Sequence, residues 1–135
     1  CYQAVLQVMN EVKKEIKPGV TIKELNDKVI EQFIEKHIFL GLYQKEDLKD
    51  PTKQTWKKHF PHAIPHFIGL DVHDYGDKNI TLNKGMVISW EPGLYIPEEN
   101  IGIRIEDDVL VDTPSVNLSE KIPKEVEDIE RLCSQ

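Results

Sequence analysis

The sequence lacks a long hydrophobic run, a basic block and a cysteine framework. No stretch approaches the roughly 18 apolar residues that cross a bilayer, and the N-terminal residues do not combine a basic end with an apolar run. The 24 acidic residues outnumber the 17 Lys and Arg residues, which leaves a net charge of -7 without a basic stripe to meet phosphates. These absences argue against nucleic acid and membrane as partners and favour peptides, small molecules, cations or other proteins.

Cysteine is also scarce. The only two cysteines, Cys1 and Cys133, lie at opposite ends of the chain. Two cysteines are too few for a disulfide framework, and this spacing does not suit a zinc site. We therefore expect a reducing, cytoplasmic location. Because the chain opens on Cys1 and an apolar periodicity is established by Val5, we expect the natural start, with any targeting signal, to lie upstream.

The composition is sufficient for one domain spanning residues 1–135, since 39% of the residues are hydrophobic. Apolar residues recur every three or four positions in residues 2–16, which predicts a helix with one buried face, ended by Pro18 and Gly19. The predicted buried residues of this helix are Val5, Val8, Met9, Val12 and Ile16.

A second helix is predicted to begin at Thr21, which forms a capping-box pattern with Glu24, and to end at Gly41. Its predicted inward residues are Ile22, Leu25, Val29, Phe33 and Ile34. Two amphipathic helices in succession need an apolar surface to cover. The Lys-rich stretch 43–60, interrupted by Pro51, is interpreted as a surface connection with a short helical turn.

Short β-branched runs between turn residues follow, and they predict antiparallel strands. The predicted strands are residues 70–74, 86–91, 101–105 and 109–112, with a break at Pro92 and Gly93. A short C-terminal helix is predicted with Pro123 as its first residue and with Val126, Ile129 and Leu132 on its apolar face. Helices followed by strands predict an α+β domain with the helices packed on one face of the sheet.

Histidines cluster in the middle of the chain, where four of the five lie between residues 59 and 73. His62 and His66 have the spacing of a helical metal pair, but Pro61 and Pro65 directly precede them. A proline pushes the residue before it away from helical angles, so this segment is not expected to be a helix. The helical zinc-protease interpretation is thereby excluded, and the two imidazoles are expected to play different roles. His37 and His59 are interpreted as structural or solvated histidines.

Two carboxylates lie on neighbouring predicted strands, Glu91 before Pro92 and Glu106 after Ile105. If these strands pair, both carboxylates project from one face of the sheet, where they repel unless a cation or a proton lies between them. Carboxylates with imidazole suit Mn, Co, Fe or Zn, and a pair of such metals can activate a bridging water. A metal site at Glu91 and Glu106 is therefore a hypothesis from the residues alone.

Three ordered segments carry a resemblance to a known family. They are residues 66–74 (HFIGLDVHD), 91–95 (EPGLY) and 102–108 (GIRIEDD). In order and spacing they resemble the pita-bread metallopeptidases, in the branch of Xaa-Pro aminopeptidases and prolidases, and the likeness covers nearly the whole chain. The resemblance implies a pita-bread fold, of which this chain would be the C-terminal portion.

The resemblance also implies roles for particular residues. His66, Glu91 and Glu106 correspond to ligands of a centre of two divalent metals, with Mn expected first and Co, Zn or Fe as alternatives. Glu91 also corresponds to the proton acceptor for the nucleophilic water. The remaining implied residues surround the reaction: His73 and His62 as catalytic and substrate-binding histidines, Arg104 as a supporting arginine, and Tyr95 as a pocket residue.

The implied activity is that of a metal-dependent aminopeptidase, which releases the N-terminal residue from peptides with proline second by attack of a metal-bridging water. Prolidase activity and a non-catalytic peptide- or protein-binding module are the alternatives, and whether the protein forms a homo-oligomer stays open. The family's two further metal ligands, both aspartates, lie upstream of the first helix and are absent here. We therefore expect the isolated chain to be metal-poor and inactive. Trp90 departs from the family, in which a β-branched residue precedes the glutamate.

Overall fold

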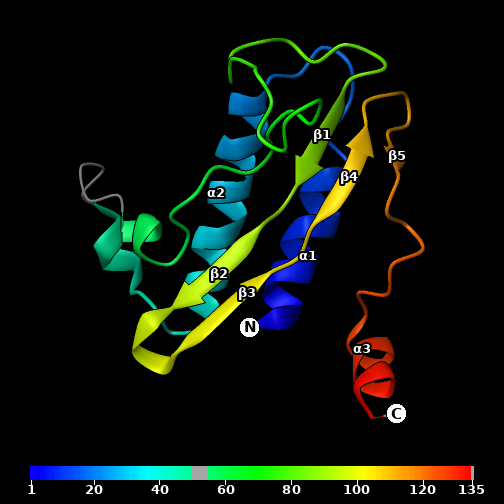
Figure 1. The fold of residues 1–135 in the computed structure, drawn as a ribbon. Helices are drawn as coiled ribbons and strands as arrows, with labels where there is room; N and C mark the ends of the chain where they lie inside the picture. Colours follow the sequence, from blue (N-terminus) through cyan, green and yellow to red (C-terminus); the bar gives the residue numbers. More distant parts are fainter. Residues whose placement is uncertain (50–54, 135) are drawn as a thin grey trace.

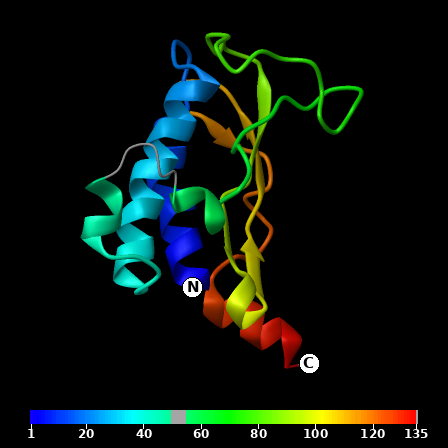
Figure 2. The ribbon, with the colours of Figure 1, turned by 90° about the vertical axis from the view of Figure 1, so that its left-hand side faces the viewer.

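The computed structural model describes residues 1–49 and 55–134. Two helices, α1 (Tyr2–Lys13) and α2 (Ile22–Phe39), lie side by side and cover one face of a long antiparallel hairpin (Figures 1 and 2). The hydrophobic core fills the space between the helices and the hairpin. The predicted α+β architecture, with helices on one face of an antiparallel sheet, is confirmed.

The first helix buries its predicted face, because Val5, Val8, Met9 and Val12 all lie in the core. The helix ends at Lys13, three residues earlier than predicted, although Ile16 is still buried. The chain then turns back through Gly19, whose positive φ of 97° is a conformation that side chains other than glycine rarely adopt.

Helix α2 has the predicted capping box. The Glu24 amide donates to Thr21 Oγ1 over 3.1 Å, and the Thr21 amide donates to the Glu24 carboxylate over 2.7 Å. Gly41 follows the helix with a φ of 74° and closes its C-terminal end, as predicted. The prediction for Ile34 is wrong, because that residue is only half-buried and His37 takes the inward position. His37 lies one turn beyond Phe33 on the same stripe, whereas Ile34 is rotated away from it.

The segment between helix α2 and the hairpin contains two short 3₁₀ helices, η1 (Lys45–Lys49) and η2 (Thr55–Lys58), which confirm helical turns there. Pro51 lies outside the described residues.

The strand predicted at residues 70–74 is wrong, because this stretch is a loop closed by Asp74. The Asp74 carboxylate accepts hydrogen bonds from the Leu70 and Tyr75 amides, over 2.9 and 2.6 Å. Its own amide donates to the Phe67 carbonyl over 3.0 Å. The side-chain oxygens of aspartate thus satisfy backbone groups that a strand partner would otherwise meet. The apolar residues of the loop, including Leu70 and Val72, are exposed.

The hairpin consists of two ladders in series. Strand β1 (Val87–Trp90) pairs with β4 (Asp107–Leu110), which also pairs with the short β5 (Val116–Asn117). Strand β2 (Gly93–Ile96) pairs with β3 (Ile101–Arg104) across the 3₁₀ turn η3 (Pro97–Glu99). The strands predicted at 86–91, 101–105 and 109–112 correspond to β1, β3 and β4. Strand β2 is not among the predicted strands.

Both ladders keep the same register. Trp90 lies opposite Asp107 in the first ladder, and Gly93 lies opposite Arg104 in the second. A hydrogen bond of 3.3 Å from the Ile105 amide to the Pro92 carbonyl links the ladders across the gap. Glu91 therefore lies opposite Glu106 where the regular pairing is interrupted.

The C-terminal helix α3 (Val126–Cys133) confirms a helix, but Pro123 precedes it instead of being its first residue. The helix begins after Glu125, and none of its residues is buried. Its apolar face therefore does not pack into the core as the sequence pattern suggested, and Leu132 is 50% exposed. Among residues 1–49 and 55–134, none of the helices combines the length and the hydrophobicity that a membrane crossing requires.

Candidate metal and substrate site

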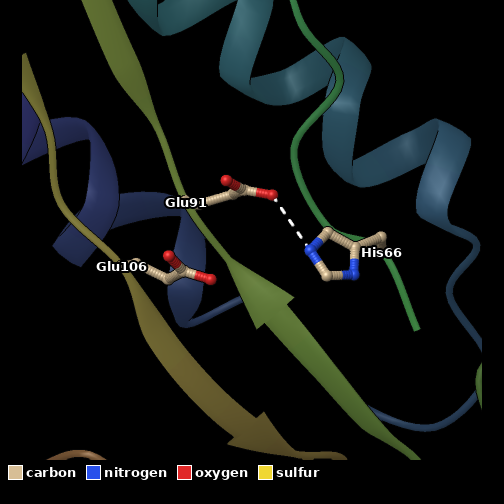
Figure 3. Close-up of side chains that lie close together, drawn as sticks. All are labelled: His66, Glu91 and Glu106. Carbon is tan, nitrogen blue, oxygen red and sulfur yellow. Dashed lines mark ion pairs between the residues drawn. The ribbon is translucent and has the colours of Figure 1, made fainter. Parts of the chain in front are cut away.

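The three residues predicted as metal ligands converge beside the hairpin (Figure 3). One ligand atom from each of His66, Glu91 and Glu106 lies within 4.8 Å of the others. His66 Nε2 is 3.2 Å from Glu91 Oε1. Glu91 is buried, His66 is half-buried and Glu106 is exposed. The group thus forms a small open cluster at the edge of the core.

The hairpin register explains why the two carboxylates meet. Directly opposed residues of an antiparallel ladder project from the same face, so Glu91 and Glu106 face each other across the interruption. Two like charges at this separation repel unless a positive charge compensates them. Arg104 supplies part of that charge, with its Nε 3.5 Å from Glu91 Oε2. The other oxygen of Glu91 faces His66.

Hydrogen bonds fix the orientation of His66. Its Nδ1 lies 3.0 Å from the Phe67 carbonyl, and a carbonyl oxygen can only accept, so Nδ1 carries the proton. The backbone of His66 is held by Ser89, whose hydroxyl accepts the His66 amide over 3.1 Å and whose amide donates to the His66 carbonyl over 2.9 Å. Nε2 is therefore the nitrogen presented to the carboxylates.

This arrangement fits a divalent cation. With Nδ1 protonated, Nε2 offers a lone pair toward a carboxylate, and two such acceptors need a cation or a proton between them. Metal-ligating histidines typically donate their other ring N–H to a carbonyl or carboxylate, as His66 does. An imidazole with two carboxylates suits Mn, Co, Fe or Zn.

His73 lies next to this cluster. Its ring centroid is 4.5 Å from that of His66, and it comes from the exposed loop closed by Asp74. The structure thus brings His73 beside a predicted metal ligand, although the strand predicted for this segment is absent.

His62 and Tyr95 form a second pair. The Nδ1–H of His62 donates to the Ala63 carbonyl over 3.1 Å, which leaves Nε2 to accept the Tyr95 hydroxyl over 2.9 Å. Tyr95 is in strand β2, two residues beyond Gly93. A Cβ at Gly93 would lie 2.8 Å from Tyr95 Oη and 3.0 Å from His62 Nε2. The missing side chain of Gly93 therefore makes room for this pair.

Gly93→Ala is expected to break the hydrogen bond between His62 and Tyr95, because its methyl group would occupy the space of the Tyr95 hydroxyl. The loss should cost about 1 kcal/mol of folding free energy. The imidazole nitrogen signals of His62 in NMR spectra measure the bond directly. Gly102→Ala is the matched control, because a Cβ there would meet only the Tyr95 ring at 3.4 Å. Equal His62 signals in the two variants would contradict this prediction.

His59 supports Tyr95 in a way that the sequence did not indicate. The buried His59 donates from Nδ1 to the Tyr95 carbonyl over 2.8 Å, and the Tyr95 amide donates to the His59 carbonyl over 2.9 Å. Spacing could not reveal this contact, because it depends on strand β2. Both His59 and His37 are buried, which favours the structural over the solvated interpretation.

Comparisons with known proteins agree with this geometry. Residues 1–113 match the family model described as Metallopeptidase family M24. The chain is 36% identical to human Xaa-Pro aminopeptidase 3 over 147 residues, which cover 99% of this chain and 29% of the human protein. The solved structure of Escherichia coli aminopeptidase P with the inhibitor Pro-Leu superimposes with a TM-score of 0.88 at 32% identity. Proline aminopeptidase P II from Yersinia pestis gives a TM-score of 0.88 at 33% identity.

Each superposition covers 98% of this chain. It covers only 33% of the Escherichia coli structure and 34% of the Yersinia pestis structure. The chain therefore spans about a third of the length of these relatives. The similarity confirms the predicted pita-bread fold. With the family model matched over most of the sequence and the fold shared with aminopeptidases P, the chain belongs to metallopeptidase family M24.

Proposed function

We propose that this chain is the C-terminal portion, residues 1–135, of the catalytic domain of a metal-dependent Xaa-Pro aminopeptidase. The whole enzyme would release the N-terminal residue from peptides with proline in second position. The observation that carries the proposal is the convergence of His66, Glu91 and Glu106 within 4.8 Å. The names of the relatives, Xaa-Pro aminopeptidase and aminopeptidase P, support the substrate class.

Bound divalent cations would polarise the scissile carbonyl and lower the pKa of a water molecule to the range in which it serves as a nucleophile. Glu91 is suited to take the proton of that water, because it is buried and its two oxygens face different partners. Arg104 forms an ion pair with Oε2, and Oε1 lies close to His66 Nε2. A positioned carboxylate of this kind is a general base.

Proline imposes a further requirement, because the bond to its nitrogen carries no N–H and its cleavage releases a secondary amine that needs a proton. Glu91 would return the proton that it accepted. His73, beside His66, is placed to stabilise negative charge that develops on the carbonyl oxygen. His62 and Tyr95, joined by their hydrogen bond, would bind the substrate beside the carboxylates.

Two cations are proposed for the whole enzyme, with Mn first and Co, Zn or Fe as alternatives. His66, Glu91 and Glu106 would hold them together with two aspartates supplied by the preceding part of the protein. Of these three ligands only the two carboxylates are charged, and they offset the charge of two dications incompletely, so the 135-residue chain by itself is proposed to bind metal weakly and to lack activity. A reducing, cytoplasmic compartment stays our proposal for the location. It rests on the cysteine content, and both thiols are free and exposed.

The test is a turnover assay of the full-length protein with defined metal loading, on Xaa-Pro peptides of increasing length. Cleavage of tripeptides and longer peptides after the first residue is the expected result. Cleavage of dipeptides alone would identify a prolidase instead. Absence of hydrolysis with any metal, together with peptide binding, would identify a non-catalytic binding module.

A further inference from the structure

We propose that Trp90 and Asp107 are positioning residues that set the separation of the Glu91 and Glu106 carboxylates by anchoring the hairpin to helix α1. The inference deepens the proposed function, since it rests on the metal site formed by those carboxylates. Neither Trp90 nor Asp107 would touch the metal or the substrate. They would act through the strand residues beside them.

Trp90 ties strand β1 to helix α1. Its side chain is fully buried, and its indole Nε1–H donates to the Met9 carbonyl over 3.0 Å. Met9 is itself fully buried in the core. A buried indole N–H needs an acceptor, and the helix backbone provides one at a fixed position. The contact therefore fixes the end of β1 both by packing and by a directed hydrogen bond.

Asp107 ties strand β4 to the same helix. Its carboxylate is buried, with Oδ2 lying 3.1 Å from Lys13 Nζ and 2.8 Å from Asn117 Nδ2. Lys124 Nζ lies 2.7 Å from Oδ1, an ion pair without hydrogen-bond alignment. Lys13 follows Met9 by four residues, which is about one turn of a helix. The two anchors thus contact successive turns of α1.

The register links these anchors to the site. Trp90 and Asp107 lie opposite each other, and the next pair toward the hairpin turn is Glu91 and Glu106. Successive residues of a strand project to opposite faces. Accordingly, Trp90 and Asp107 contact α1, whereas Glu91 and Glu106 converge with His66. The anchored pair is therefore immediately behind the carboxylate pair.

The anchors lie where the hairpin most needs support. Regular ladder pairing stops between Trp90 and Gly93, and the hydrogen bond from the Ile105 amide to the Pro92 carbonyl is 3.3 Å long. The two carboxylates face each other within this interruption, and their repulsion favours separation of the strands. Holding both strands to one rigid helix opposes that separation and keeps the ligands at the spacing that a cation requires.

Trp90→Phe and Asp107→Asn test the proposal in the 135-residue chain. Asp107→Asn keeps the shape of the side chain and removes its charge, whereas Trp90→Phe keeps a smaller aromatic ring and removes the indole N–H. Only Asp107→Asn changes a charge, so a shared effect cannot come from altered charge. Ile88→Val is the control, because it trims a buried residue of the same strand away from the anchored pair. Lys124→Met is a second control, because it removes a partner of Asp107 that is not on α1.

Two measurements read the outcome, of which the first needs no metal. Hydrogen exchange compares the Ile105 amide, in the interruption, with the Val111 amide, bonded to the Met86 carbonyl at the open end of the hairpin over 2.8 Å. Titration with Mn²⁺, followed by the EPR signal of the free ion, gives the metal affinity. Trp90→Phe and Asp107→Asn should lower the protection of Ile105 more than that of Val111 and weaken Mn²⁺ binding by about tenfold. Ile88→Val should change neither the protection of Ile105 nor the affinity for Mn²⁺. Lys124→Met should change both quantities less than the two anchor variants do.

Equal loss of protection at Ile105 and Val111 in the two anchor variants would overturn the proposal, since it would show a general loss of stability. Unchanged protection at both amides would overturn it too. If the unmodified chain binds no Mn²⁺ at any concentration tested, the metal-binding part of the proposed function fails for this chain. The comparison of the two amides then still decides whether Trp90 and Asp107 hold the strands together.

Discussion

Glu91→Gln is expected to lower the turnover of Xaa-Pro peptides by the full-length protein by roughly 10²- to 10⁴-fold, the range that a general base contributes. Glutamine preserves the shape of the side chain but loses the charge that faces His66 and Arg104. It can neither accept the proton of the nucleophilic water nor offset the charge of a cation. The affinity for Mn²⁺ should fall together with turnover.

Folding stability should respond differently to the same substitution. Glu91 and Glu106 repel each other in the metal-free chain, so removing one charge should leave the free energy of unfolding unchanged or raise it. Urea denaturation of the metal-free chain measures this quantity. Glu99→Gln, which makes the same chemical change on the exposed turn η3, should leave turnover unaltered. Near-normal turnover of Glu91→Gln would rule out its role as the base.

Acidification from pH 6.5 to pH 4 is expected to destabilise the chain by on the order of 3 kcal/mol through His37 alone. Burial, and to a smaller extent the charge of the nearby His59, together lower the pKa of His37 from 6.5 to about 4. Nε2 of His37 is buried without a hydrogen-bond partner among the described residues, whereas Nδ1 lies 2.7 Å from the Tyr43 hydroxyl. Protonation would therefore place a charge in the core.

The direction in which stability changes with pH follows from whether the folded or the unfolded chain binds the proton. Between pH 6.5 and pH 4 the unfolded chain binds a proton at His37 and the folded chain does not, so stability is complete above pH 6.5 and falls as the pH drops toward 4. Urea denaturation at a series of pH values measures the slope of the free energy of unfolding against pH. His37→Phe should flatten it, because phenylalanine does not titrate and can keep the stacking with Phe33. An equally steep slope in His37→Phe would assign the effect to other groups.

The sequence predicted the helical layer well, because its signals are local. The capping box of Thr21 and Glu24 and the three- and four-residue periodicity act within a few turns, and both survive in the folded chain. The inward position of His37 was harder to predict. Its place on the helix follows from periodicity, but its burial depends on partners such as Tyr43 and His59.

The hairpin was predicted only in part. The break expected at Pro92 and Gly93 is present, because regular pairing stops after Trp90 and resumes at Gly93, but the register is the same on both sides of it, which the sequence did not indicate. The loop at residues 70–74 resembled a strand because of its β-branched residues, but the Asp74 carboxylate replaces the strand partner. Trp90 could not be explained from the sequence, because its hydrogen-bond acceptor belongs to a helix 81 residues earlier in the chain.

The candidate site could be predicted from the sequence to the extent that its residues lie close together in the chain. Glu91 and Glu106 were expected to face each other if their strands paired, and the register shows that they do. The pairing of His62 with Tyr95 and the support from His59 and Ser89 could not be foreseen. Each depends on contacts across the sheet that residue types and spacing do not encode.

The unbroken register of the hairpin also determines where the chain can change in length. Residues added at the tip, around η3, would extend the loop without altering which residue faces Glu91, because the ladder on the site side of the turn is untouched. A single residue inserted into only one strand between Glu91 and the tip would shift the pairing and turn either Glu91 or Glu106 to the other face. Length variation among homologues should therefore concentrate at the tip, which also makes it a suitable place for a spectroscopic label or an affinity tag.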